Sequence, residues 1–138
     1  MTREVFWYVF FAFIAFDFLL LIFVLWRKFK TRRIFGVQKK YLNSQWEIVK
    51  KLFVVDSKAA LIEADKLLDY AMKLAFNNKF SVGQNLKANG KIFTDLNGIW
   101  YVHKLRNQLV HQLSFKLKAR DISLAKTNFY QALKDLGM

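Results

Sequence analysis

The chain has 138 residues, no cysteine, no proline and a formal net charge of +13 at pH 7. The length leaves room for one small domain and an additional segment, and the lack of cysteine excludes structural disulfides and agrees with a reducing compartment. Half of the basic excess lies in residues 27–40, so it does not by itself indicate a nucleic-acid partner.

The first segment is strongly apolar. Between Val5 and Trp26 the only ionisable side chain is Asp17, and aromatic residues stand near both ends. As a helix these 22 residues measure about 33 Å, enough to cross a ~30 Å hydrocarbon core. We therefore predict an N-terminal segment, residues 1–26, with a transmembrane helix at about 5–26.

Asp17 is unusual in such a segment, because a carboxylate near the bilayer centre costs about 2.5–3.5 kcal/mol on the insertion scale. Two interpretations stay open. Asp17 is either a tolerated neutral acid or a group that accepts a hydrogen bond from a partner helix.

Basic residues follow the apolar segment without an acidic one, and we interpret residues 27–40 as a basic juxtamembrane segment. Positive flanks stay on the cytoplasmic side, which predicts a single-pass protein of the cell membrane with its N-terminus outside. Basic side chains at this position are expected to contact anionic lipid headgroups. Those nearest the span are Arg27, Lys28, Lys30, Arg32 and Arg33.

Residues 41–138 show helical periodicity and no apolar–polar alternation, which predicts a cytoplasmic all-α domain. A capping box at Ser44-Gln-Trp-Glu47 predicts a helix start, and this helix should run to about Phe53. Asp56 and Ser57 can cap the next helix, which Asn77-Asn78 ends. Its apolar stripe is Leu61, Ala64, Leu68, Ala71 and Ala75.

Three further helices are predicted in the second half of this domain. A weaker capping box at Ser81-Val-Gly-Gln84 opens a short helix that Asn89-Gly90 ends. Asp95 or Asn97 starts the next helix, and the last runs from about Lys118 to Leu136. The total is four principal helices and one short one, which fits a small helical bundle.

The heptapeptide LRNQLVH, Leu105 to His111, has two interpretations. On a helical wheel Arg106 lies on the apolar face, where a guanidinium needs a carboxylate partner. In the structural interpretation Arg106 pairs with Asp65, or with Glu63 or Asp69, and His111 binds carbonyls at the helix end.

In the functional interpretation the same residues form a catalytic group. His111 could act as a general acid or base, Arg106 could stabilise negative charge on a phosphate, and Asn107 could orient the histidine. One chain lacks a second titratable group in a suitable place. Two copies facing each other would supply two histidines and two arginines.

The Arg-Asn-three residues-His pattern, late in a small helical domain, resembles the R-polar-x3-H motif of the HEPN superfamily. The resemblance covers about residues 41–138 and implies a four- or five-helix bundle that often dimerises. In nuclease members the motif forms a metal-independent RNA-cleaving site across two copies, which would place Arg106, Asn107 and His111 in it. The segments IEADKLLD and DLNGIWYVHKLRNQLVH resemble small bacterial membrane-anchored helical proteins more specifically.

Other candidates are less specific. Trp100 and Tyr101 could stack on bases, with His103 and Lys104 as polar neighbours, although aromatic residues of a small bundle usually belong to the core. We predict no metal site, because the chain lacks cysteine and an ordered acidic pair, and no cofactor.

Two functions follow. The first is a membrane-anchored binding or scaffolding module without catalysis, expected to form a homodimer and to bind a protein or an RNA. The alternative is a metal-independent endoribonuclease with a composite dimer site built from Arg106 and His111.

Overall fold

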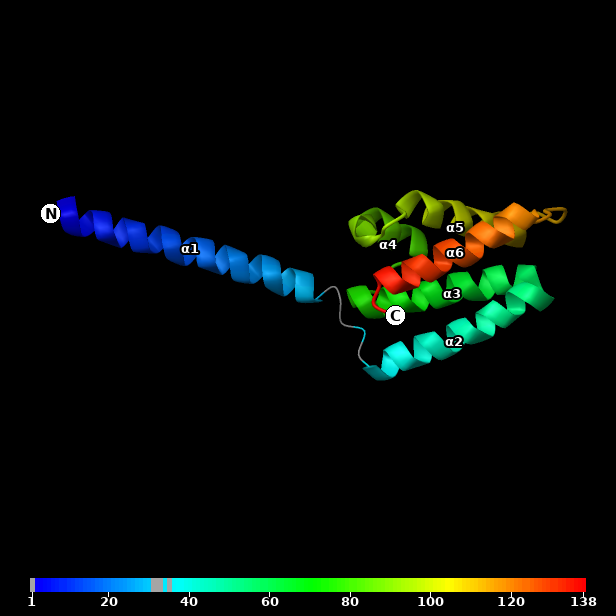
Figure 1. Ribbon diagram of the computed structural model, residues 1–138. Helices are drawn as coiled ribbons and strands as arrows, with labels where there is room; N and C mark the ends of the chain where they lie inside the picture. The colour runs from blue at the N-terminus through cyan, green and yellow to red at the C-terminus, as the bar shows by residue number, and fades with distance from the viewer. Residues whose placement is uncertain (1, 31–33, 35) are drawn as a thin grey trace. The chain divides into compact units, whose positions relative to one another are not determined.

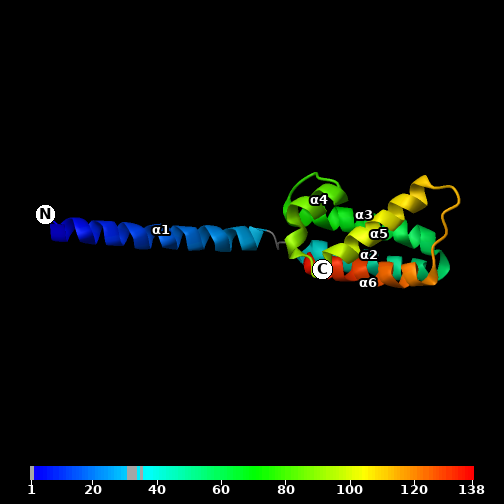
Figure 2. The ribbon, with the colours of Figure 1, turned by 90° about the horizontal axis from the view of Figure 1, so that it is seen from above.

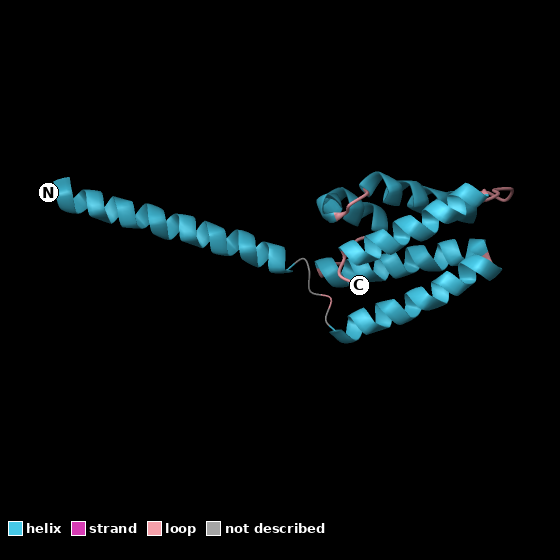
Figure 3. Cartoon of the chain, viewed as in Figure 1, coloured by secondary structure: helices cyan, strands magenta, loops and turns pink. Residues whose placement is uncertain are grey.

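A computed structural model describes residues 2–30, 34 and 36–138, with side chains for all of these except residues 27–30. Every regular element in this part of the chain is a helix (Figure 3). The chain divides into two compact units, Met1–Arg32 and Arg33–Met138.

The first unit is the helix α1, Thr2–Lys30. Its portion Thr2–Trp26 has 25 residues and a mean hydropathy of 2.7, and none of it is buried within the structure. At ~1.5 Å per residue this portion is long and apolar enough to cross a membrane, and it begins three residues earlier than predicted. Among the predicted flanking residues, Arg27, Lys28 and Lys30 continue the helix, whereas Arg32 and Arg33 lie outside the described residues.

The second unit begins with α2, Gly36–Val55. The predicted start at Ser44 is wrong, because the helix begins eight residues earlier and includes Lys39 and Lys40, which were assigned to the juxtamembrane segment. The Ser44 hydroxyl donates to the Tyr41 carbonyl at 2.7 Å, as serines inside helices commonly do. A serine followed by a glutamate three residues later can thus stand in the middle of a helix.

The helix α3, Ser57–Phe76, begins and ends where the sequence predicts. Asp56 is its N-cap, and its carboxylate accepts from two backbone N–H groups, each at 3.1 Å. Asn77 ends it in the left-handed conformation, with φ 49°. All five residues of the predicted apolar stripe are buried.

The short helix α4, Val82–Asn89, confirms the second capping box. Gln84 N–H donates to the Ser81 hydroxyl at 3.2 Å, and Ser81 N–H donates to the Gln84 side chain at 2.9 Å. The 3₁₀ turn η1, Gly90–Ile92, follows.

Two long helices complete the unit: α5, Leu96–His111, and α6, Ala119–Asp135. Asp95, rather than Asn97, caps α5 by accepting from Gly98 N–H at 2.8 Å. Gly137 follows α6 with φ 108°, a conformation that favours glycine.

The helices α3 and α6 form the centre of the bundle. α2 packs on α3 and α6 from one side, while α5 packs on the same two helices from the other (Figure 1). The view from above shows α5 in front and α2 behind α6 (Figure 2). The core between these helices includes the fully buried side chains of Leu42, Leu61, Leu68 and Phe129, so α2 and α5 present their outer faces on opposite sides of the bundle.

Candidate functional site

Arg106 lies on α5, at the edge of the face that packs on α3. Its Nε atom is 3.4 Å from Asp65 Oδ2, and the side chains of Arg106 and Asp65 are 27% and 6% exposed. This contact is an ion pair without hydrogen-bond geometry, because the buried Nε–H makes no hydrogen bond within the described residues. Arg106 is therefore engaged with a buried carboxylate of the core.

The other two acids considered for Arg106 pair elsewhere. Glu63 forms an ion pair with Lys66 at 2.7 Å, and Asp69 forms one with Lys73. Both pairs join residues of α3 itself, three and four positions apart. Asp65 is the acid that points away from this solvent-exposed side and into the bundle.

His103 is a second partner of Asp65 that the sequence analysis did not pair with it. Its Nδ1 atom is 2.7 Å from Asp65 Oδ1, and its side chain is 15% exposed. His103 precedes Arg106 by one helical turn, so both side chains reach α3 from the same side of α5. On the helical wheel His103 lies about 60° from Arg106, and this spacing is the sequence signal that could have suggested their shared neighbourhood.

Asn107 closes the network. Arg106 Nη1 donates to Asn107 Oδ1 at 3.0 Å, and Asn107 Nδ2 lies 3.4 Å from His103 Nε2. Together with the two contacts of Asp65, these interactions join four side chains in a closed polar ring: Asp65, His103, Arg106 and Asn107.

One tautomer of the neutral His103 ring satisfies both of its contacts. With Asn107 Nδ2 donating to His103 Nε2 at 3.4 Å, the proton of the ring lies on Nδ1 and points at Asp65. In this arrangement a buried carboxylate receives one hydrogen bond and one ionic contact, which offset the loss of its hydration.

His111 does not belong to the polar ring. It is the last residue of α5 and is exposed, and within the described residues its ring makes no hydrogen bond. The expectation that His111 binds carbonyls at the helix end is therefore wrong for this structure. It stands five residues after Arg106, about 140° around the helix, so the two motif residues face different surroundings.

The predicted binding residues also separate. Trp100 is half-buried, with its ring centroid 6.3 Å from that of His103 in an edge-to-face arrangement. Tyr101 is 43% exposed and reaches toward α6, and Lys104 is exposed on the outer side of α5. The structure thus brings His103, Arg106 and Asn107 together but places Tyr101 in a different site.

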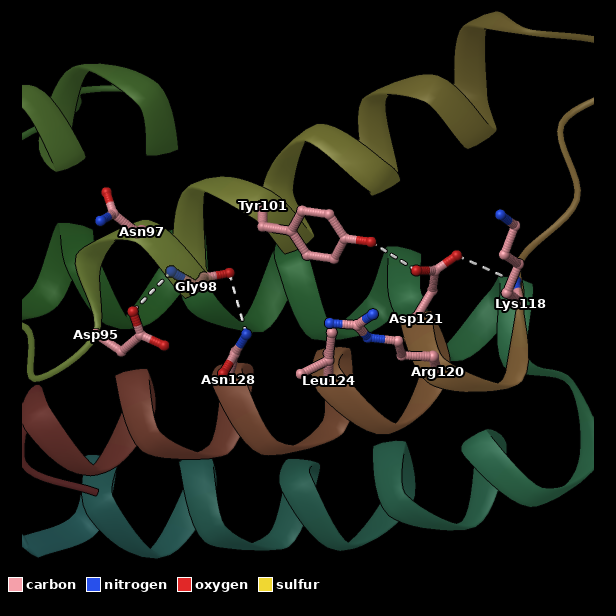
Figure 4. A pocket seen from close by; sticks show the side chains of 9 residues that line it. All are labelled: Asp95, Asn97, Gly98, Tyr101, Lys118, Arg120, Asp121, Leu124 and Asn128. Carbon is pink, nitrogen blue, oxygen red and sulfur yellow. Dashed lines mark hydrogen bonds between the residues drawn. The ribbon is translucent and has the colours of Figure 1, made fainter.

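That site is a groove between α5 and α6 with a volume of about 670 Å³ (Figure 4). The Tyr101 hydroxyl donates to Asp121 Oδ1 at 2.6 Å, and Asp121 also accepts from the Lys118 N–H at 3.1 Å. At the other end Asn128 donates to the Gly98 carbonyl at 3.2 Å. The groove is lined by Asp95, Asn97, Gly98, Tyr101, Lys118, Arg120, Asp121, Leu124 and Asn128.

The bond between Tyr101 and Asp121 shifts the pKa values of both groups. It favours the charged carboxylate, so the pKa of Asp121 is lowered, and the adjacent carboxylate raises the pKa of the Tyr101 phenol. Tyr101 is thus held as a neutral donor with its ring partly open to solvent. The sequence analysis named Tyr101 but missed Asp121, because nothing local indicates a partner 20 residues away.

The described residues hold no cluster of three or more His, Cys, Asp or Glu side chains arranged to bind a metal ion. No protein-family model, curated protein or solved structure matches the chain. The resemblance to the HEPN superfamily therefore stays a prediction that rests on the motif and the helical context.

Proposed function

We propose that the chain is a membrane-anchored binding module without catalytic activity. In this proposal α1 spans the cell membrane with the N-terminus outside, and the bundle lies in the cytoplasm as a homodimer. The observation that carries the proposal is the polar ring, in which Asp65 and Asn107 hold the arginine of the motif. An arginine held in this way contributes to the fold, and this is the role that the proposal assigns to it.

The groove between α5 and α6 is the surface that we assign to the partner. It is concave, and it presents the partly exposed ring of Tyr101 between polar groups of both helices. Lys118 and Arg120 stand at one end, and no carboxylate of the described residues forms an ion pair with either. Aromatic side chains and arginine are enriched at protein interfaces.

A ribonuclease of HEPN type is the second candidate, and one observation favours it. His111 is exposed and not engaged in a hydrogen bond within the described part of the chain, so its ring is free to transfer protons. This activity would require a second copy to supply another arginine and histidine.

RNA cleavage separates the two candidates. The full chain in lipid vesicles would be incubated with labelled structured and single-stranded RNA in the presence of EDTA, as wild type, His111→Ala and Lys134→Ala, an exposed control on α6. We expect no cleavage by any of the three. Cleavage that survives the chelator and the Lys134 substitution, but disappears in His111→Ala, would overturn the binding module and establish the ribonuclease.

The orientation of the chain needs its own measurement. Protease added to the outside of intact cells should leave the bundle uncut, because the basic flank predicts a cytoplasmic position. Digestion of the bundle without cell lysis would overturn the proposed topology, and with it any cytoplasmic partner.

A further inference from the structure

α2 carries two apolar faces, only one of which the bundle covers. The covered face contains Leu42, Trp46, Val49 and Phe53, which are all buried. The opposite face carries apolar residues that remain exposed: Val37 at 83%, Ile48 at 52% and Val55 at 84%. Tyr41, at the edge of this face, is 48% exposed, and its ring also packs edge-to-face on Tyr70 of α3 with centroids 5.6 Å apart. An amphipathic helix of a small bundle normally has polar residues in such positions.

The exposed apolar residues have heptad spacing. Together with Ser44 and Lys51 they occupy positions 37, 41, 44, 48, 51 and 55, with alternating intervals of four and three residues. At ~100° per residue these positions fall within an arc of roughly 80°, on the side away from the core. We call these six residues the α2 seam, because this is the pattern by which two helices pack along their length.

We propose that the α2 seam is the interface between two copies of the chain, with the two α2 helices antiparallel. In this arrangement Val37 of one copy packs on Ile48 of the other, and Tyr41 packs on Ser44. Each large side chain thus meets a smaller one. The Ser44 hydroxyl already donates within its own helix, so it can be covered without losing a partner.

The charges beside the seam favour the antiparallel arrangement. Lys40 and Glu47 lie on the same flank of α2, and across an antiparallel pair each lysine approaches the glutamate of the other copy. Within its own helix Glu47 also forms an exposed ion pair with Lys50 at 2.6 Å, which Lys40 of the other copy would join or replace. A parallel pair would instead place Lys51 opposite Lys51, with like charges facing each other. In the antiparallel register Lys51 and Val55 fall opposite positions that precede Gly36, where α2 of the other copy begins, so both stay outside the paired segment and Lys51 avoids this repulsion.

The membrane anchor makes a short seam sufficient. In this register the two helices meet in four pairs, two of Val37 with Ile48 and two of Tyr41 with Ser44. Four pairs are few for association of free molecules, but two copies held in one membrane have a raised effective concentration. This inference identifies the surface through which the proposed homodimer forms. It rests on the proposed function because it requires the membrane anchor.

The position of α2 gives the inference a functional consequence. α2 and α5 lie on opposite sides of α3 and α6 (Figure 1). Pairing through the α2 seam therefore leaves the polar ring and the groove of each copy on the outer faces of the dimer. The two copies of His111 do not meet across the interface, so the pair presents two separate partner surfaces instead of one composite site.

Cysteine cross-linking tests the seam, because the natural chain has no cysteine. The full chain in lipid vesicles would be oxidised as Val37→Cys, as Ile48→Cys and as the double variant. We expect a disulfide-linked dimer only in the double variant. In the antiparallel register each position lies about 16 Å along the helix from its own symmetry mate, whereas Val37 of one copy faces Ile48 of the other.

The remaining outcomes overturn the inference. Efficient cross-linking of both single variants would indicate a parallel pair. A dimer formed by His111→Cys, but not by the double seam variant, would indicate pairing through α5. No cross-linked product at any position would remove the seam as an interface and leave the RNA test of the proposed function unaffected.

Discussion

Removing the arginine of the motif, Arg106→Ala, should destabilise the bundle by a moderate amount. Breaking a fully buried ion pair typically costs about 3–5 kcal/mol, because the remaining charge is left without a partner. Here Asp65 keeps the hydrogen bond from His103 at 2.7 Å, and the Arg106 side chain is 27% exposed. We therefore expect a loss of about 1–3 kcal/mol, comparable to the loss of one hydrogen-bond partner.

Removing the acid should cost more. Asp65→Ala takes away the acceptor of His103 and the counter-ion of Arg106, whose buried Nε then has no acidic partner. We expect about 3–5 kcal/mol, close to the full value for a broken buried pair. The two substitutions in combination should cost less than their sum, because they disrupt the same contact.

Thermal unfolding of the full chain in detergent, followed by circular dichroism, measures these losses. For a bundle of this size each kcal/mol shifts Tm by about 4–8 °C. Lys104→Ala, an exposed neighbour outside the polar ring, is the matched control and should change stability by less than ~0.5 kcal/mol. An unchanged Tm for Arg106→Ala, or a smaller loss for Asp65→Ala than for Arg106→Ala, would refute the structural role of the polar ring.

The remaining predictions concern the groove and the glycines of the bundle. Because the pKa of Asp121 is lowered in the folded state, its carboxylate stabilises the fold at pH values above the unfolded pKa of about 3.9. In urea unfolding, wild type should therefore be more stable than Asp121→Asn near neutral pH, and this advantage should disappear as the pH falls through the native pKa. An advantage that persists in acid would contradict the bond between Tyr101 and Asp121. The raised pKa of Tyr101 works in the opposite direction, so wild type should lose stability relative to Tyr101→Phe as the pH rises above 10. Gly98→Ala should destabilise α5 by about 1 kcal/mol despite the better helix propensity of alanine, because a Cβ atom there collides with the capping carboxylate of Asp95. Gly83→Ala, whose Cβ would meet only the Trp100 ring at 3.8 Å, should instead stabilise by up to ~1 kcal/mol, and equal Tm shifts for the two variants would count against this difference.

The caps of the bundle could be predicted from the sequence because their partners are local. Asp56 and Ser81 accept from N–H groups two or three residues away, so the pattern and the contact lie in the same short stretch. Ser44 shows the limit of the same reasoning. Its capping-box pattern is present, but upstream residues continue the helix, and the hydroxyl bonds backward to Tyr41 instead.

The apolar pattern determined which face of α3 is buried, but not whether a second apolar face of a helix is covered. The α2 seam follows the same helical period as the buried face of α2. Only the packing of α2 on α3 and α6 shows which of the two faces belongs to the core.

The sequence by itself determined the apolar N-terminal helix, the all-helical second unit and most helix boundaries, because these depend on composition and on contacts within about four residues. It also required a carboxylate near Arg106, with three acids of α3 as candidates. Only the tertiary structure decided that Asp65 is this acid, that His103 shares it and that Tyr101 bonds to Asp121. These contacts join residues 20 to 41 positions apart. They form because of the way each helix is rotated and packed against its neighbours, which no local sequence pattern specifies.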